Sequence, residues 1–69
     1  MKISARNQIK GTIVDVSKGA TTSHVRIEVA AGLVLTASIT NEAVEELGLK
    51  KGMTATAIIK ASDMMIGIA

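Results

Sequence analysis

The feature that most constrains this chain is a strict alternation of apolar and polar residues, clearest over His24-Val25-Arg26-Ile27-Glu28-Val29. Successive side chains of a strand point to opposite faces, so every second residue of this segment shares one face. Ala30-Ala31-Gly32 supplies a turn, and the alternation resumes over residues 33–39. The pattern predicts a β-hairpin with one apolar face.

The segments on either side of this hairpin predict more strands and one helix. Over residues 8–17 the apolar positions change parity, which indicates a bulge or strong coiling, and residues 18–22 predict a loop. Thr40 or Asn41 can cap a short helix that ends at Gly48. A fourth strand is predicted over residues 53–59. After residues 61–63, a fifth strand is predicted from Met64 to Ile68.

The predicted order is three strands, one short helix and two strands in a single domain over residues 1–69. That order is typical of an all-β, five-stranded barrel of the oligonucleotide/oligosaccharide-binding (OB) type, with its helix between strands 3 and 4. A small SH3-like barrel is the alternative, but it normally lacks a helix at this place. We therefore expect the OB-type barrel.

Composition excludes several classes of protein and indicates self-association. The chain has no cysteine, proline, Phe, Tyr or Trp, so disulfide scaffolds, zinc fingers and thiol nucleophiles are ruled out. No apolar run approaches the about 18 residues of a spanning helix, and no signal peptide is recognised, so we expect a cytoplasmic protein. A domain this small without disulfides or aromatic anchors is marginal as a monomer. We therefore expect a homo-oligomer.

Catalytic and nucleic-acid-binding groups are sparse. His24 is the only histidine and lies on a polar strand face, and Glu42, Glu45 and Glu46 fit a solvated helix face. A serine–lysine pair is possible by residue type, but so small a barrel offers no expected substrate pocket, so we predict no enzyme and no catalytic cofactor. Single-strand binders stack bases on aromatic rings and phosphate binders need a dense basic stripe. The chain has neither, with a formal charge of only +2.

Two short polar segments remain, one near each terminus. They are Ser4-Ala5-Arg6-Asn7 and Lys60-Ala61-Ser62, and each places a cation within two residues of a hydroxyl. Together they offer a guanidinium, an ammonium, hydroxyls, an amide and backbone N–H groups as donors. The two cations match a doubly charged tetrahedral oxyanion. Ordinary polar residues at strand ends are the alternative interpretation.

Over nearly its whole length the chain resembles the molbindins, the small molybdenum-pterin-binding (Mop) proteins. The likeness lies in Ile3-Ser4-Ala5-Arg6-Asn7-Gln8-Ile9-Lys10-Gly11, in residues 39–49, and in the stretch from Gly52 to Ile59-Lys60-Ala61-Ser62-Asp63. Neither Ser-Ala-Arg-Asn nor Lys-Ala-Ser alone is specific for this family. The placement of both motifs on either side of a helix segment is specific for it.

The resemblance implies an OB-type barrel that assembles as a hexamer and binds molybdate or tungstate between subunits. Ser4, Arg6 and Asn7 of one subunit would meet Lys60, Ala61 and Ser62 of another. The loop of Gly19, Ala20, Thr21 and Thr22 would add backbone N–H donors, although the family tends to have an aliphatic residue where Thr21 or Thr22 stands. The metal would be held only through its oxo ligands.

The resulting functional hypothesis is storage and homeostasis of molybdate or tungstate by a protein with no nucleic-acid or membrane partner. A molybdate-sensing module that acts through a partner protein is the first alternative. A nucleic-acid-binding OB barrel is the second.

Overall fold

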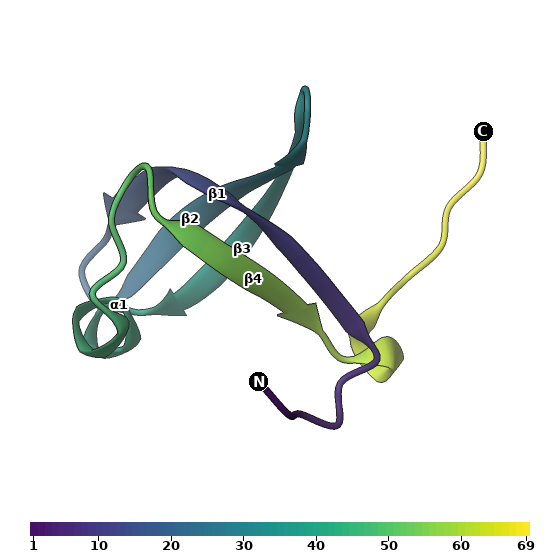
Figure 1. Cartoon of the computed structure of the whole chain (residues 1–69), viewed down its shortest axis with the longest axis horizontal. Coiled ribbons are helices and arrows are strands. Elements are labelled where there is room, and N and C mark those ends of the chain that lie inside the picture. Colours follow the sequence, from purple (N-terminus) through teal and green to yellow (C-terminus); the bar gives the residue numbers. More distant parts are fainter.

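A computed structural model describes residues 1–69, and its centre is one four-stranded antiparallel sheet (Figure 1). The strands are β1 (Asn7–Lys18), β2 (Thr22–Ala30), β3 (Leu33–Thr40) and β4 (Thr54–Ile59), in the spatial order β3-β2-β1-β4. Helix α1 (Asn41–Leu47) lies between β3 and β4 in the chain, and a 3-10 helix (Ala61–Asp63) follows β4. The predicted hairpin is confirmed as β2 and β3, in which Val25 faces Ala37.

The predicted irregularity of the first strand is also confirmed. The β1–β2 register shifts between Ile13 and Asp15, which is the β-bulge that the change of parity indicated. Two residues before Ile13, Gly11 lies so close to β2 that an added Cβ would be 2.5 Å from the Glu28 carbonyl oxygen. The missing side chain lets β1 coil tightly across β2 while it pairs with β4 on its other edge.

Helix α1 begins and ends as its sequence predicts. The Thr40 hydroxyl accepts a hydrogen bond of 3.1 Å from the Ala43 amide, so Thr40 is the N-cap. Gly48 adopts the left-handed conformation with φ 61° and ends the helix, because glycine has no Cβ to oppose a positive φ. Val44 is the buried residue of the helix and packs into a core with Ile13, Val25 and Ile27.

The predicted fifth strand does not form within this chain. Residues 64–69 have no regular structure, and no backbone hydrogen bond involves residues 65–69. Figure 1 shows this segment running away from the sheet after the 3-10 helix. Because a strand requires a hydrogen-bonded neighbour, an apolar, strand-like pattern is not sufficient to create one. The sheet therefore has two free edges, β3 and β4, instead of closing into a five-stranded barrel.

Candidate functional site

The two polar segments predicted from sequence meet at one end of the sheet. β1 pairs with β4 in an antiparallel ladder whose last pair is Asn7 with Ile59. The residues just before β1 and just after β4 must therefore lie side by side. A single chain is enough to bring these segments together, whereas the resemblance implied a meeting between two subunits.

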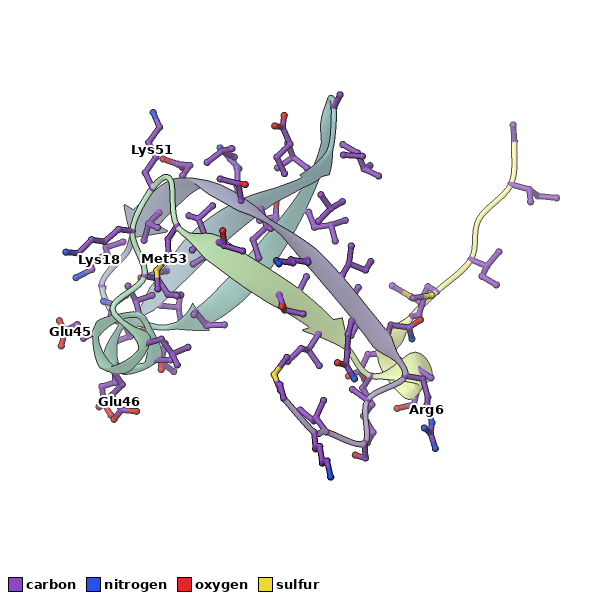
Figure 2. All side chains as sticks on the ribbon, viewed as in Figure 1. Arg6, Lys18, Glu45, Glu46, Lys51 and Met53 are labelled. Carbon is purple, nitrogen blue, oxygen red and sulfur yellow. The ribbon has the colours of Figure 1, made fainter.

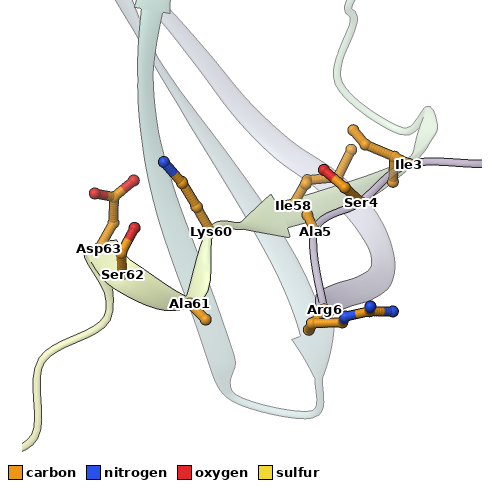
Figure 3. A pocket seen from close by; sticks show the side chains of 9 residues that line it. All are labelled: Ile3, Ser4, Ala5, Arg6, Ile58, Lys60, Ala61, Ser62 and Asp63. Carbon is orange, nitrogen blue, oxygen red and sulfur yellow. The ribbon is translucent and has the colours of Figure 1, made fainter.

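An open hollow of about 610 Å³ lies between these segments. Figure 3 shows the side chains that line it: Ile3, Ser4, Ala5, Arg6, Ile58, Lys60, Ala61, Ser62 and Asp63. Except for half-buried Ala5, all of these residues are exposed. Six of the seven residues that were predicted in the two polar segments thus line one hollow, and Asn7 is the exception.

The cations of the hollow have no carboxylate partner. The chain has two ion pairs, Lys18 with Glu45 at 3.7 Å and Arg26 with Asp15 at 3.8 Å, and neither includes Arg6 or Lys60. The backbone N–H groups of Ala61 and Ser62 also donate no hydrogen bond within the chain. In Figure 3 the Arg6 guanidinium and the Lys60 ammonium point in different directions.

Two residues differ from the sequence-based expectation. The Asn7 side-chain amide donates a 3.2 Å hydrogen bond to the Ile59 carbonyl, so Asn7 holds the β1–β4 junction and does not line the hollow. Asp63 lines the hollow but was not predicted. It places a negative charge beside the donors, and its position directly after Ser62 was the available signal.

The loop of residues 19–22 lies at the other end of the molecule. Arg6 precedes the 12-residue β1 and Lys18 ends it, and a strand rises about 3.3 Å per residue. Figure 2 accordingly shows Arg6 at one end of the ribbon and Lys18 beside Glu45 of α1 at the other. Within one chain this loop cannot contact the hollow.

The carbonyl groups of this loop accept hydrogen bonds from the start of α1. Some of the loop's backbone N–H groups remain without an acceptor. Asn41 donates to the Gly19 carbonyl with its side chain (3.0 Å) and to the Thr21 carbonyl with its backbone N–H (2.9 Å). The Gly19 N–H is used, because it donates to the Thr22 carbonyl at 2.8 Å. The N–H groups of Ala20 and Thr21 donate no hydrogen bond within the chain.

The fold has no cluster of side chains that could ligate a metal ion. No group of three or more His, Cys, Asp or Glu side chains could hold a metal ion. His24 is exposed on β2. None of the helices is both long enough and apolar enough to span a membrane. The hollow of hydroxyls and cations is the grouping of polar side chains that could recognise a ligand.

Comparison with known proteins identifies the family. The model of the TOBE domain matches residues 3–66, and the chain is 50% identical over 66 residues to molybdenum-pterin-binding protein 1 of Clostridium pasteurianum. That alignment covers 96% of this chain and 97% of the relative. The chain belongs to the molybdenum-pterin-binding (Mop) family of TOBE domains. The resemblance inferred from sequence is thus confirmed.

Solved structures of Mop proteins have the same fold. MopII from Clostridium pasteurianum, in an apo form, superimposes with a TM-score of 0.91 at 46% identity, covering 97% of this chain and all of that one. The cytoplasmic molybdate-binding protein ModG, with molybdate bound, superimposes with a TM-score of 0.93 at 40% identity. This chain spans 49% of the ModG chain. These relatives are named for binding and not for catalysis.

Proposed function

We propose that this Mop-family chain binds molybdate and tungstate as a cytoplasmic homo-oligomer, a hexamer, and stores the anion without catalysing a reaction. The observation that carries the proposal is the hollow beside the β1–β4 junction, in which Arg6 and Lys60 have no ion-pair partner. It is supported by relatives that are named for molybdenum or molybdate, one of them with molybdate bound.

The chemistry of the hollow suits an oxyanion whose metal keeps its oxo ligands. The donors are the guanidinium of Arg6, the ammonium of Lys60 and the hydroxyls of Ser4 and Ser62. Two positive charges balance a molybdate or tungstate dianion. Hydrogen bonds from charged donors are roughly twice as strong as neutral ones. The metal itself needs no protein ligand in such a site.

Rejection of smaller anions has two separate causes. Sulfate carries the same charge as molybdate but has shorter bonds, so discrimination depends on the size of the closed site. Hydrogen phosphate carries an O–H that must find an acceptor, because a buried unpaired donor costs about 1–3 kcal/mol. Asp63 is an acceptor at the rim, so rejection of phosphate requires its carboxylate to turn away from the bound anion.

A second copy of the chain completes the site in this proposal. The hollow is open and its polar residues are exposed, so a bound anion would keep much of its surface in water. The free N–H groups of Ala20 and Thr21 lie at the far end of the same chain, so they could reach a bound anion only in the hollow of another subunit. Enclosure between subunits would also lower the local dielectric and strengthen each hydrogen bond.

Calorimetry with molybdate, tungstate, sulfate and phosphate tests the proposal. We expect tight binding of the first two anions, and an Arg6→Ala variant that binds about 10- to 150-fold more weakly, because a hydrogen bond to a charged group contributes about 1.5–3 kcal/mol. Arg26→Ala is the matched control, since Arg26 pairs with Asp15 away from the hollow. Equal binding of all four anions, or unchanged binding by the Arg6 variant, would show that the proposal is wrong.

Native mass spectrometry tests the assembly. Six copies of the 7.1 kDa chain should appear as one species, and its ligand count gives the number of anions per oligomer. If the monomer bound molybdate as tightly as the oligomer does, the proposed binding between subunits would be contradicted.

A further inference from the structure

The loop of residues 19–22 is held against α1 by one residue, Asn41, which begins that helix. The side-chain nitrogen of Asn41 donates to the carbonyl groups of Gly19 at 3.0 Å and Ala20 at 3.4 Å. Its backbone N–H donates to the Thr21 carbonyl at 2.9 Å. A single residue therefore turns three consecutive carbonyl groups of an exposed loop toward the start of the helix.

The Asn41 amide is free for this contact and is fixed in one orientation. Thr40 caps the helix, so Asn41 has no capping role. The Asn41 Oδ1 accepts a hydrogen bond from the hydroxyl of Ser23, a residue that is only 1% exposed. The opposite orientation would place the amide oxygen against two loop carbonyl oxygens, and neither side of that contact has a hydrogen to donate.

The direction of the carbonyl groups decides the direction of the loop's N–H groups. A trans peptide unit is planar, so its C=O and the N–H of the next residue point in opposite directions. All peptide bonds of the chain are trans. The N–H groups of Ala20 and Thr21 therefore point away from Asn41, and neither donates a hydrogen bond within the chain. The loop presents two adjacent donors whose position is set before a ligand binds.

We propose that Asn41 is a positioning residue for anion binding and that it makes the site selective for anion size. The inference rests on the proposed function, in which the two N–H groups reach an anion in the hollow of another subunit. Hydrogen bonds weaken when the donor–acceptor distance leaves about 2.7–3.2 Å, so two fixed donors suit an oxyanion of one bond length. Molybdate receives both hydrogen bonds, whereas sulfate, with its shorter bonds, lies too far from one or both donors. A loop released from Asn41 loses its bonds to molybdate but is able to follow sulfate inward.

Calorimetry with molybdate and with sulfate on Asn41→Asp tests the inference. The carboxylate keeps the size of the side chain and the acceptor for Ser23, but it has no N–H for the Gly19 and Ala20 carbonyls. We expect molybdate affinity to fall about tenfold, as for the loss of two neutral hydrogen bonds, and sulfate affinity to fall about twofold. The added negative charge acts alike on both dianions, so the ratio of the two affinities reports the position of the donors.

Gly48→Ala is the matched control at the other end of α1. It strains a backbone with φ 61°, although nothing lies within 4 Å of the added Cβ. This variant should lose stability and keep the ratio of affinities, which separates positioning from a general loss of stability. An unchanged ratio in Asn41→Asp, in a protein that binds molybdate, would overturn the inference and leave the proposed function standing. Wild-type protein that takes up no molybdate would overturn both.

The amide resonances of the wild-type protein give a second test, which decides if Asn41→Asp does not fold. Molybdate should shift the amide proton resonances of Ala20 and Thr21 downfield. The Gly19 amide, which already donates to the Thr22 carbonyl at 2.8 Å, should move less. If the first two resonances stay in place while molybdate binds, the loop supplies no donors and the role of Asn41 is refuted.

Discussion

Asn7 and Ile59 face each other at the last pair of the β1–β4 ladder, and the Asn7 side chain donates a further hydrogen bond of 3.2 Å to the Ile59 carbonyl. This doubled link brings the residues that precede β1 against those that follow β4. The two ends of the chain thereby form a single hollow. Asn7 and Ile59, which are separated by 52 positions in the sequence, form the pair of the β1–β4 ladder that lies nearest this hollow.

Replacing Asn7 should therefore weaken anion binding from outside the hollow. In Asn7→Ala, loss of the side-chain hydrogen bond should lower the free energy of unfolding by about 1 kcal/mol and reduce molybdate affinity several-fold. Urea denaturation and calorimetry measure the two effects. Lys10→Ala, an exposed change on the same strand, should alter neither. Unchanged affinity in Asn7→Ala would show that the junction does not position the donors.

Removing the charge of Asp63 should strengthen anion binding. Asp63 lines the hollow together with Lys60, and its carboxylate repels a bound dianion. Exposed charge pairs contribute about 0.2–1 kcal/mol, so Asp63→Asn should raise molybdate affinity by up to about fivefold, with a smaller gain at high salt. Glu46→Gln on the exposed side of α1 is the control for net charge. A loss of affinity would mean that Asp63 holds the turn in place.

Asn41 should contribute more to stability than the N-cap beside it. Its side chain accepts a hydrogen bond from the hydroxyl of Ser23, a residue only 1% exposed, and donates one to the Gly19 carbonyl. Asn41→Ala leaves the buried hydroxyl without this partner, which costs about 1–3 kcal/mol. Thr40→Ala removes a cap that contributes about 1 kcal/mol.

Chemical denaturation of the two variants compares these losses. Ser23→Ala combined with Asn41→Ala should recover part of the loss, because no buried hydroxyl is then left unpaired. If the single change at Asn41 proves milder than Thr40→Ala, the network between the loop and α1 is not a main source of stability.

Several elements could be predicted from the sequence because they depend on residues that are close together in the chain. The alternation through Val25 and Ile27 fixed both the hairpin and the face that is buried. Thr40 and Gly48 mark the helix ends through hydrogen bonds and a backbone conformation that involve only the adjacent turn. The change of parity near Val14 predicted a bulge, since one extra residue reverses which face each side chain takes.

The candidate site was predicted less completely. Ser4, Arg6, Lys60 and Ser62 line one hollow within a single chain, whereas the resemblance implied that they would meet across two subunits, and their role in binding stays a prediction. Asn7 holds the β1–β4 junction instead of lining the hollow, and Asp63 was missed. Residue type cannot tell an amide that binds a ligand from one that bonds to the neighbouring strand. That distinction depends on where the Ile59 carbonyl lies.

The sequence by itself determined the kinds of element, their order and the polar segments at their ends, because strand alternation, helix capping and turns depend on residues close together in the chain. Only the tertiary structure decided which edges of the sheet stay free, that the segment after Asp63 has no partner in its own chain, and that residues 19–22 lie opposite the hollow. Each of these depends on pairing between distant segments. Local pattern sets the propensity to form a strand, and the available hydrogen-bonding neighbour decides whether and where it forms.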